Sequence, residues 1–113
     1  MRYMLLIGGD EAPAGFDAHE FCNSPEVRAW GDDLRSRGMW VGGDLLHPPK
    51  EATTVRIRDG ALLVSDGPFA ETKEQVGGYA ILECANLDEA IDAAAGHPSA
   101  QFGLVEVRPI WQP

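Results

Sequence analysis

The chain has 113 residues and a formal net charge of −9, from 9 Lys and Arg against 18 Asp and Glu. This length suits one domain, and a hydrophobic fraction of 44% argues against disorder. The acidity argues against a nucleic-acid partner, because phosphate binding needs positive charge, and no apolar run approaches the roughly 18 residues of a membrane-spanning helix. We therefore expect a single domain over residues 1–113 with neither nucleic-acid nor membrane partners.

Cysteine and motif content point to an intracellular protein without a cofactor. Cys22 and Cys84 form no CxxC pair, and the N-terminal segment is apolar too briefly for a signal peptide. A reducing cytoplasm is therefore the expected location. The three histidines lack a metal-ligand spacing such as HxH or HExxH, and no GxGxxG or P-loop is present. We expect neither a metal nor another cofactor.

The first third of the chain predicts a strand, a loop, a helix and a strand, over residues 2–8, 10–23, 25–37 and 39–46. Ser24 is a typical N-cap, Pro25 suits the first helical position, and Gly38 is a typical helix terminator. The pair Gly42-Gly43 inside a strand indicates a bulge or the close approach of another group.

The middle of the chain predicts a β-hairpin, because Asp59-Gly60 separates two β-rich runs, residues 53–58 and 61–65. Val55 and Ile57 alternate with polar residues, so one face of the hairpin is expected in the core and the other in water.

The remaining predicted elements are a polar loop over 66–75, a strand over 76–84, a helix that ends at Gly96 and a strand over 104–111. Asn86 with Glu89 resembles a capping box at the start of that helix. The helix is expected to bury an apolar stripe of Leu87, Ala90, Ile91 and Ala94, and tryptophans including Trp111 are expected in the core or a dimer interface.

With the hairpin set aside, the predicted elements follow the order β-α-β-β-α-β, which is the ferredoxin-like split βαβ pattern. The expected fold class is α+β, an antiparallel sheet with both helices on one face. The other face would carry apolar side chains that this short chain cannot cover, so we expect a homodimer.

One stretch is distinctive: Asp66-Gly67-Pro68-Phe69-Ala70-Glu71-Thr72-Lys73, followed by Gly77-Gly78-Tyr79. It resembles the signature of the YCII-related family, specifically its DGPF-domain branch, and the resemblance covers nearly the whole chain. It implies a dimeric α+β barrel, similar to the muconolactone-isomerase and antibiotic-monooxygenase types. YCII-like relatives carry a proposed His/Asp pair in a cleft, and one is a dehydrochlorinase of a chlorinated hydroxyquinol. Genes of the branch often lie beside alternative sigma factors, which implies a bacterial regulatory context.

Asp66 and His47 are the candidate catalytic residues. Asp66 begins a tight Gly-Pro turn, where its carboxylate either bonds the N–H groups of its own turn or acts as a general base. His47 follows the second strand, and a His–Asp pair with Asp66 would suit proton transfer near neutral pH. The alternative for His47 is an ordinary exposed loop residue before two prolines.

The candidate ligand-binding residues are Lys73, Glu71, Tyr79, Phe69 and Arg56. Lys73 either binds an anionic group or belongs with Glu71 to a solvated charge cluster. We expect the Phe69 side chain to pack within its own loop, more than to serve as a surface on which a ligand stacks. Tyr79 shares a strand face with two residues, one of them glycine, which leaves room beside its hydroxyl. Arg56 pairs with surface carboxylates or binds an anion.

Two classes of function remain open. The first is a cofactor-independent lyase or isomerase, in which Asp66, assisted by His47, moves a proton on a small molecule held between sheet and helices. The alternative is a non-catalytic ligand-binding or regulatory module linked to an alternative sigma factor. The geometry of Asp66 and His47 discriminates between them.

Overall fold

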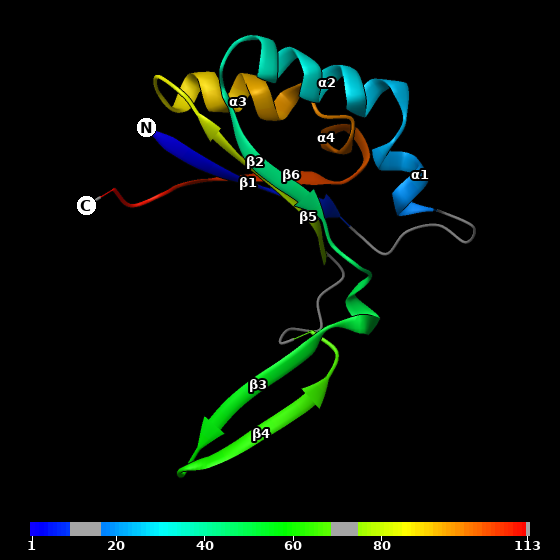
Figure 1. Ribbon diagram of the computed structural model, residues 1–113, viewed down its shortest axis with the longest axis vertical. Coiled ribbons are helices and arrows are strands. Elements are labelled where there is room, and N and C mark those ends of the chain that lie inside the picture. The colour runs from blue at the N-terminus through cyan, green and yellow to red at the C-terminus, as the bar shows by residue number, and fades with distance from the viewer. Residues whose placement is uncertain (10–16, 69–74, 113) are drawn as a thin grey trace.

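The computed structural model describes residues 1–9, 17–68 and 75–112. Its elements, in chain order, are β1 (Arg2–Gly9), α1 (Ala18–Cys22), α2 (Pro25–Ser36), β2 (Trp40–Leu45), the 3₁₀ turn η1 (Pro49–Glu51), β3 (Thr53–Arg58), β4 (Ala61–Asp66), β5 (Gln75–Glu83), α3 (Leu87–Ala95), α4 (Ser99–Phe102) and β6 (Leu104–Pro109). Figure 1 shows a sheet with helices on one side and a hairpin that projects from the other.

Four strands form an antiparallel sheet in the order β2-β5-β1-β6. The helices α2 and α3 cover one face of this sheet (Figure 1). With the hairpin set aside, this strand order is that of the ferredoxin-like split βαβ fold. The prediction of an α+β fold with both main helices on one face is confirmed.

The sequence signals at the ends of α2 are confirmed. The Val27 N–H donates to Ser24 Oγ at 3.4 Å, and Pro25 occupies the first turn, where its missing N–H removes no helical bond. The helix ends at Ser36, and Gly38 follows with a φ of +71°, a conformation that favours glycine.

The expectation for the Gly42-Gly43 pair is confirmed as well. The pairing of β2 with β5 shifts register between Trp40 and Gly42, as in a β-bulge. A Cβ on Gly43 would lie 2.5 Å from the carbonyl oxygen of Tyr79. Only glycine therefore allows β2 to pack this closely on β5.

Side chains fill the space between the sheet and the helices. Leu5, Leu34 and Leu82, from three different elements, are fully buried there. The rest of the core is made of one aromatic residue, one methionine and several small residues packed around them, namely Tyr3, Met39, Ala80, Cys84, Ala90, Ala93 and Ala94. The ligand pocket expected between sheet and helices is therefore occupied by the core in the described part of the chain.

Two short helices were missed by the sequence prediction. Residues 18–22, expected as loop, form α1, and the Glu20 N–H donates to the carboxylate of its N-cap Asp17 at 3.1 Å. The other part of that expected loop, residues 10–16, lies outside the described residues. Helix α4 was not predicted. The rings of Phe21 in α1 and Phe102 in α4 meet edge to face at 5.5 Å, so tertiary contact supports helices too short to show a period.

The prediction that α3 buries an apolar stripe of Leu87, Ala90, Ile91 and Ala94 is partly wrong. Leu87 and Ile91 are 48% and 47% exposed, whereas Ala90, Ala93 and Ala94 are buried. Small side chains on the buried face let the helix lie close to the sheet. Trp111, expected in a core or interface, is 97% exposed in the single chain.

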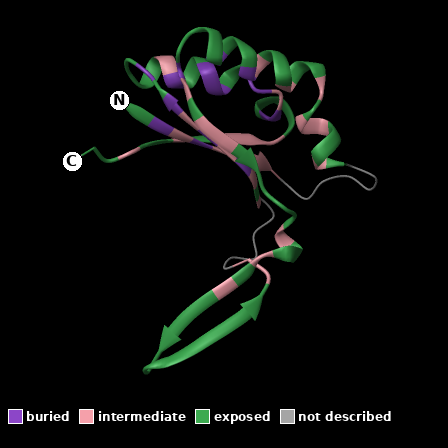
Figure 2. Cartoon of the chain, viewed as in Figure 1, coloured by how far each residue is buried: buried purple, intermediate pink, exposed green. Residues whose placement is uncertain are grey.

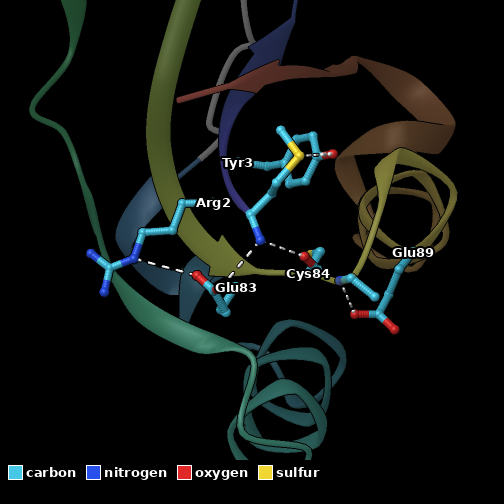
Figure 3. A network of polar contacts seen from close by, with 7 residues as sticks. Arg2, Tyr3, Glu83, Cys84 and Glu89 are labelled. Atoms are coloured by element: carbon cyan, nitrogen blue, oxygen red, sulfur yellow. Dashed lines mark hydrogen bonds and ion pairs between the residues drawn. The ribbon is translucent and has the colours of Figure 1, made fainter. Parts of the chain in front are cut away.

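The start of α3 is close to a capping box, with the second bond made one residue before the N-cap. The Glu89 N–H donates to Asn86 Oδ1, and the Ala85 N–H donates to Glu89 Oε1, both at 3.0 Å. Figure 3 shows this glutamate together with a neighbouring ion pair at the end of β5, in which Arg2 Nε lies 3.4 Å from Glu83 Oε2. These contacts fix the turn that joins β5 to α3.

The β3–β4 hairpin is correctly predicted in position but not in burial. It forms a separate two-stranded sheet, and the side chains of its strands are almost all exposed (Figure 2). Val55 and Ile57, expected in the core, are 61% and 66% exposed. The projecting hairpin gives a radius of gyration of 15.7 Å, where a compact domain of this length has about 13 Å.

Candidate functional site

His47 lies just beyond the last pairing of β2 with β5, in which the Leu46 N–H donates to the Gly77 carbonyl at 2.9 Å. The turn η1 then brings the chain back toward the histidine. His47 Nδ1 lies 3.3 Å from both carboxylate oxygens of Glu51. The imidazole is 84% exposed, and its carboxylate partner in the described structure is Glu51 instead of the expected Asp66.

Asp66 is the last residue of β4 and lies opposite Thr53. The turn after it is tied to β3, since the Gly67 N–H donates to the Ala52 carbonyl at 2.7 Å and Thr54 Oγ1 donates to the Gly67 carbonyl at 2.8 Å. The Asp66 carboxylate is exposed, and no hydrogen bond or ion pair links it to residues 1–9, 17–68 or 75–112. It is therefore available at the base of the hairpin.

These residues form one polar junction between the sheet and the hairpin, which we call the hairpin base and define as His47, Glu51 and Asp66. One residue, Ala52, separates Glu51 from β3, and Asp66 ends the strand paired with β3. Sequence reasoning missed Glu51. The signal that could have found it is the spacing of four residues across Pro48-Pro49, a proline pair that favours a tight turn.

The other predicted binding residues are placed as follows. Tyr79 is half-buried on the sheet face that the helices leave uncovered, because its neighbour Ala80 points into the core. Arg56 lies in β3, on the hairpin face opposite to Val55. Phe69, Glu71 and Lys73 lie outside the described residues, so their predicted roles stay predictions.

The hairpin base has the composition of a proton-transfer or hydrogen-bonding site. An imidazole beside a carboxylate can take up and release a proton near neutral pH, and a further carboxylate can accept hydrogen bonds. Exposure to water weakens each of these interactions. In a single chain the hairpin base is thus better suited to binding than to catalysis.

Two open hollows in the described part of the chain lie away from the hairpin base. One, of about 400 Å³, lies between α3, α4 and β6 and is lined by apolar residues such as Ile91, Leu104 and Val107. The other, of about 570 Å³, lies beside Arg2, Glu83 and Trp111.

The two cysteines lack the lowered pKa that is typical of a reactive thiol. Burial raises the pKa of Cys84, and Glu89 raises it further, while burial raises the pKa of Cys22. A raised pKa keeps a thiol protonated and unreactive. Among the described residues no group of three or more His, Cys, Asp or Glu side chains is arranged to hold a metal ion.

A model of the YCII-related domain matches residues 1–112. The chain belongs to the YCII-related family. It is also similar to an uncharacterised protein of Rhizobium meliloti (strain 1021), with 48% identity over 67 residues, which are 58% of this chain and 54% of that relative. This match thus spans about half the length of the relative. In the described part of this YCII-related chain, no helix is long and apolar enough to cross a membrane.

Proposed function

We propose that this YCII-related protein belongs to the DGPF branch and is a homodimeric ligand-binding or regulatory module that binds a small molecule at the hairpin base. The observation that carries the proposal is the filled interior of the protomer. Where a substrate would be enclosed between sheet and helices there are core side chains, whereas His47, Glu51 and Asp66 are exposed at the hairpin base. In the regulatory form of the proposal, ligand binding is coupled to a protein such as an alternative sigma factor.

The uncovered face of the sheet supports the homodimer. Met4 pairs with Ile81 and Leu6 with Tyr79, and these four side chains form an apolar stripe on the face opposite to the helices. Asp44 and Glu106 are placed beside this stripe, on the outer strands. An apolar stripe bordered by charges is typical of an interface between subunits.

The second candidate function is a cofactor-independent lyase or isomerase at the same place. The observation that favours it is the contact of 3.3 Å between His47 and Glu51, because a carboxylate that orients an imidazole is a common acid–base arrangement. In this version Asp66 or His47 removes a proton from the ligand. The function requires that the hairpin base be shielded from water when the ligand binds.

Ligand binding at the hairpin base is tested by thermal-shift screening of small hydroxylated aromatic compounds, followed by calorimetry on the compounds that stabilise the protein. We expect His47→Gln and Asp66→Asn each to raise the Kd of such a compound by about tenfold or more, the loss of a charge-assisted hydrogen bond. His19→Gln, an exposed histidine in α1, is the matched control. Unchanged binding by both variants would place the ligand elsewhere and overturn the proposal.

Catalysis is distinguished from binding with the same compounds. Incubation in D₂O, followed by proton NMR of the compound, detects exchange of a carbon-bound hydrogen. Exchange that is present with the wild-type protein and lost in His47→Gln would establish the enzyme. Binding without exchange or product formation is the result expected of the ligand-binding module.

A further inference from the structure

The β3–β4 hairpin has two chemically different faces. Val55 pairs with Val64 and Ile57 with Leu62, so these four side chains point to one face. Thr53 and Asp66 pair at the foot of the same face. We call this surface the arm face. The opposite face alternates with it and carries both arginines of the hairpin together with Leu63.

The arm face is apolar and exposed. Its side chains are 60–66% exposed, namely Val64 60%, Val55 61%, Leu62 65% and Ile57 66%. Together they present about 400 Å² of apolar surface, which is as large as the largest patch on a typical monomer. A two-stranded hairpin alone is only marginally stable in water, so a covering surface is needed to hold it.

The position of the hairpin indicates what covers it. Figure 1 shows that it projects away from α2 and α3, on the side of the sheet that these helices leave uncovered. A second copy stacked on the apolar stripe of the sheet must therefore lie beside the hairpin. The area agrees, because about 400 Å² is half of the roughly 800 Å² that each partner contributes to a standard interface. The stripe supplies further area.

The charge of the hairpin does not oppose contact with a second copy. Residues 53–66 carry two arginines and two aspartates, whereas the chain as a whole has a net charge of −9. A neutral hairpin is not repelled by the acidic body of another copy, as an acidic one would be.

We propose that the β3–β4 hairpin is a dimerisation arm whose arm face packs against the second copy, and that this packing brings Asp66 to the boundary between the subunits. The inference rests on the proposed homodimer and specifies which residues build it. The hairpin base is exposed in one protomer, and docking of the arm shields it. The ligand site proposed above is then completed only in the dimer.

The test is the dimer dissociation constant measured by sedimentation velocity. The double variant Ile57→Thr/Val64→Thr removes apolar contacts from the arm face and keeps the β-branched side chains that strands favour. Each contact is lost twice in a symmetric dimer, so we expect the Kd to rise by about 100-fold or more. Leu63→Thr, on the opposite face of the same hairpin, is the matched control and should leave the Kd unchanged. Ile81→Lys disrupts the stripe on the sheet.

The outcomes separate this inference from the proposed homodimer. A wild-type protein that is monomeric at about 100 μM, where standard interfaces are formed, would refute both. A dimer weakened by Ile81→Lys but not by the arm double variant would refute the arm alone. Equal weakening by Leu63→Thr would refute the assignment of the faces. Hydrogen exchange of residues 53–66 in the wild-type protein gives a check without mutation: protection must rise with protein concentration, and exchange independent of concentration would overturn the inference.

Discussion

His97 links the stability of the fold to pH. It is 4% exposed in the turn between α3 and α4, and its ring packs edge to face on Trp30 of α2 at 4.8 Å and on Phe21 of α1 at 6.4 Å. Its Nδ1 accepts a hydrogen bond from the Ser99 N–H at 3.0 Å, which requires a neutral ring with an unprotonated Nδ1. Burial correspondingly lowers the pKa of His97 below its ordinary value of 6.5.

Because the folded state has the lower pKa, the unfolded chain binds the extra proton more readily. The free energy of unfolding is therefore fully retained above about pH 6.5 and falls as the pH drops below that value. Protonation also removes the acceptor for the buried Ser99 N–H. Loss of that hydrogen bond, together with the cost of a charged ring in a buried place, should lower the free energy of unfolding by about 1–3 kcal/mol.

The measurement is chemical unfolding of the wild type, His97→Gln and His19→Gln between about pH 5 and pH 8, a range in which ordinary carboxylates stay ionised. We expect the wild type and the His19→Gln control to lose stability toward pH 5. The His97→Gln variant should show a flatter profile, whatever its stability at pH 8. A wild-type profile that stays flat, or that rises toward pH 5, would refute the reasoning and indicate that Trp30 stabilises the imidazolium.

Three further changes test the fold. Gly43→Ala should lower the free energy of unfolding by about 2–3 kcal/mol, because its Cβ would lie 2.5 Å from the backbone of β5, while Gly42→Ala, with open space around it, should be nearly neutral in denaturant titrations. Trp30→Phe removes the indole N–H that donates to the Ala93 carbonyl at 2.7 Å, and unfolding calorimetry should show a loss of about 1–2 kcal/mol. Asn86→Ala should reduce stability by about 1 kcal/mol through loss of the N-cap, as a lower midpoint in thermal unfolding.

The sheet and the two main helices were predictable because each carries its own local signal. Ser24 and Asn86 cap the helices, Asp59-Gly60 turns the hairpin, and apolar periodicity marks the strands between. The short helices α1 and α4 were not predictable in this way. They exist because Phe21 and Phe102 meet across the fold, a contact between residues about 80 positions apart that no local pattern carries.

For the candidate site, the partner of the histidine could not be read from the sequence. His47 and Asp66 were chosen for their chemistry as a pair, yet the imidazole meets Glu51. The deciding element is η1, a single 3₁₀ turn after two prolines that folds the chain back within four residues. The sequence prediction paired His47 with a carboxylate on another strand, whereas a carboxylate four residues along the chain lies within contact distance.

The hairpin carries the most informative disagreement between pattern and structure. Alternation of Val55 and Ile57 with polar residues is typical of a strand with one buried face, and the paired strand places Leu62 and Val64 on that same face. In the protomer that face is open to water. The pattern and the exposure agree if the burying surface belongs to another chain, as it does in the proposed dimer. In that dimer the alternation marks an interface between subunits, and in the single chain the same face is exposed.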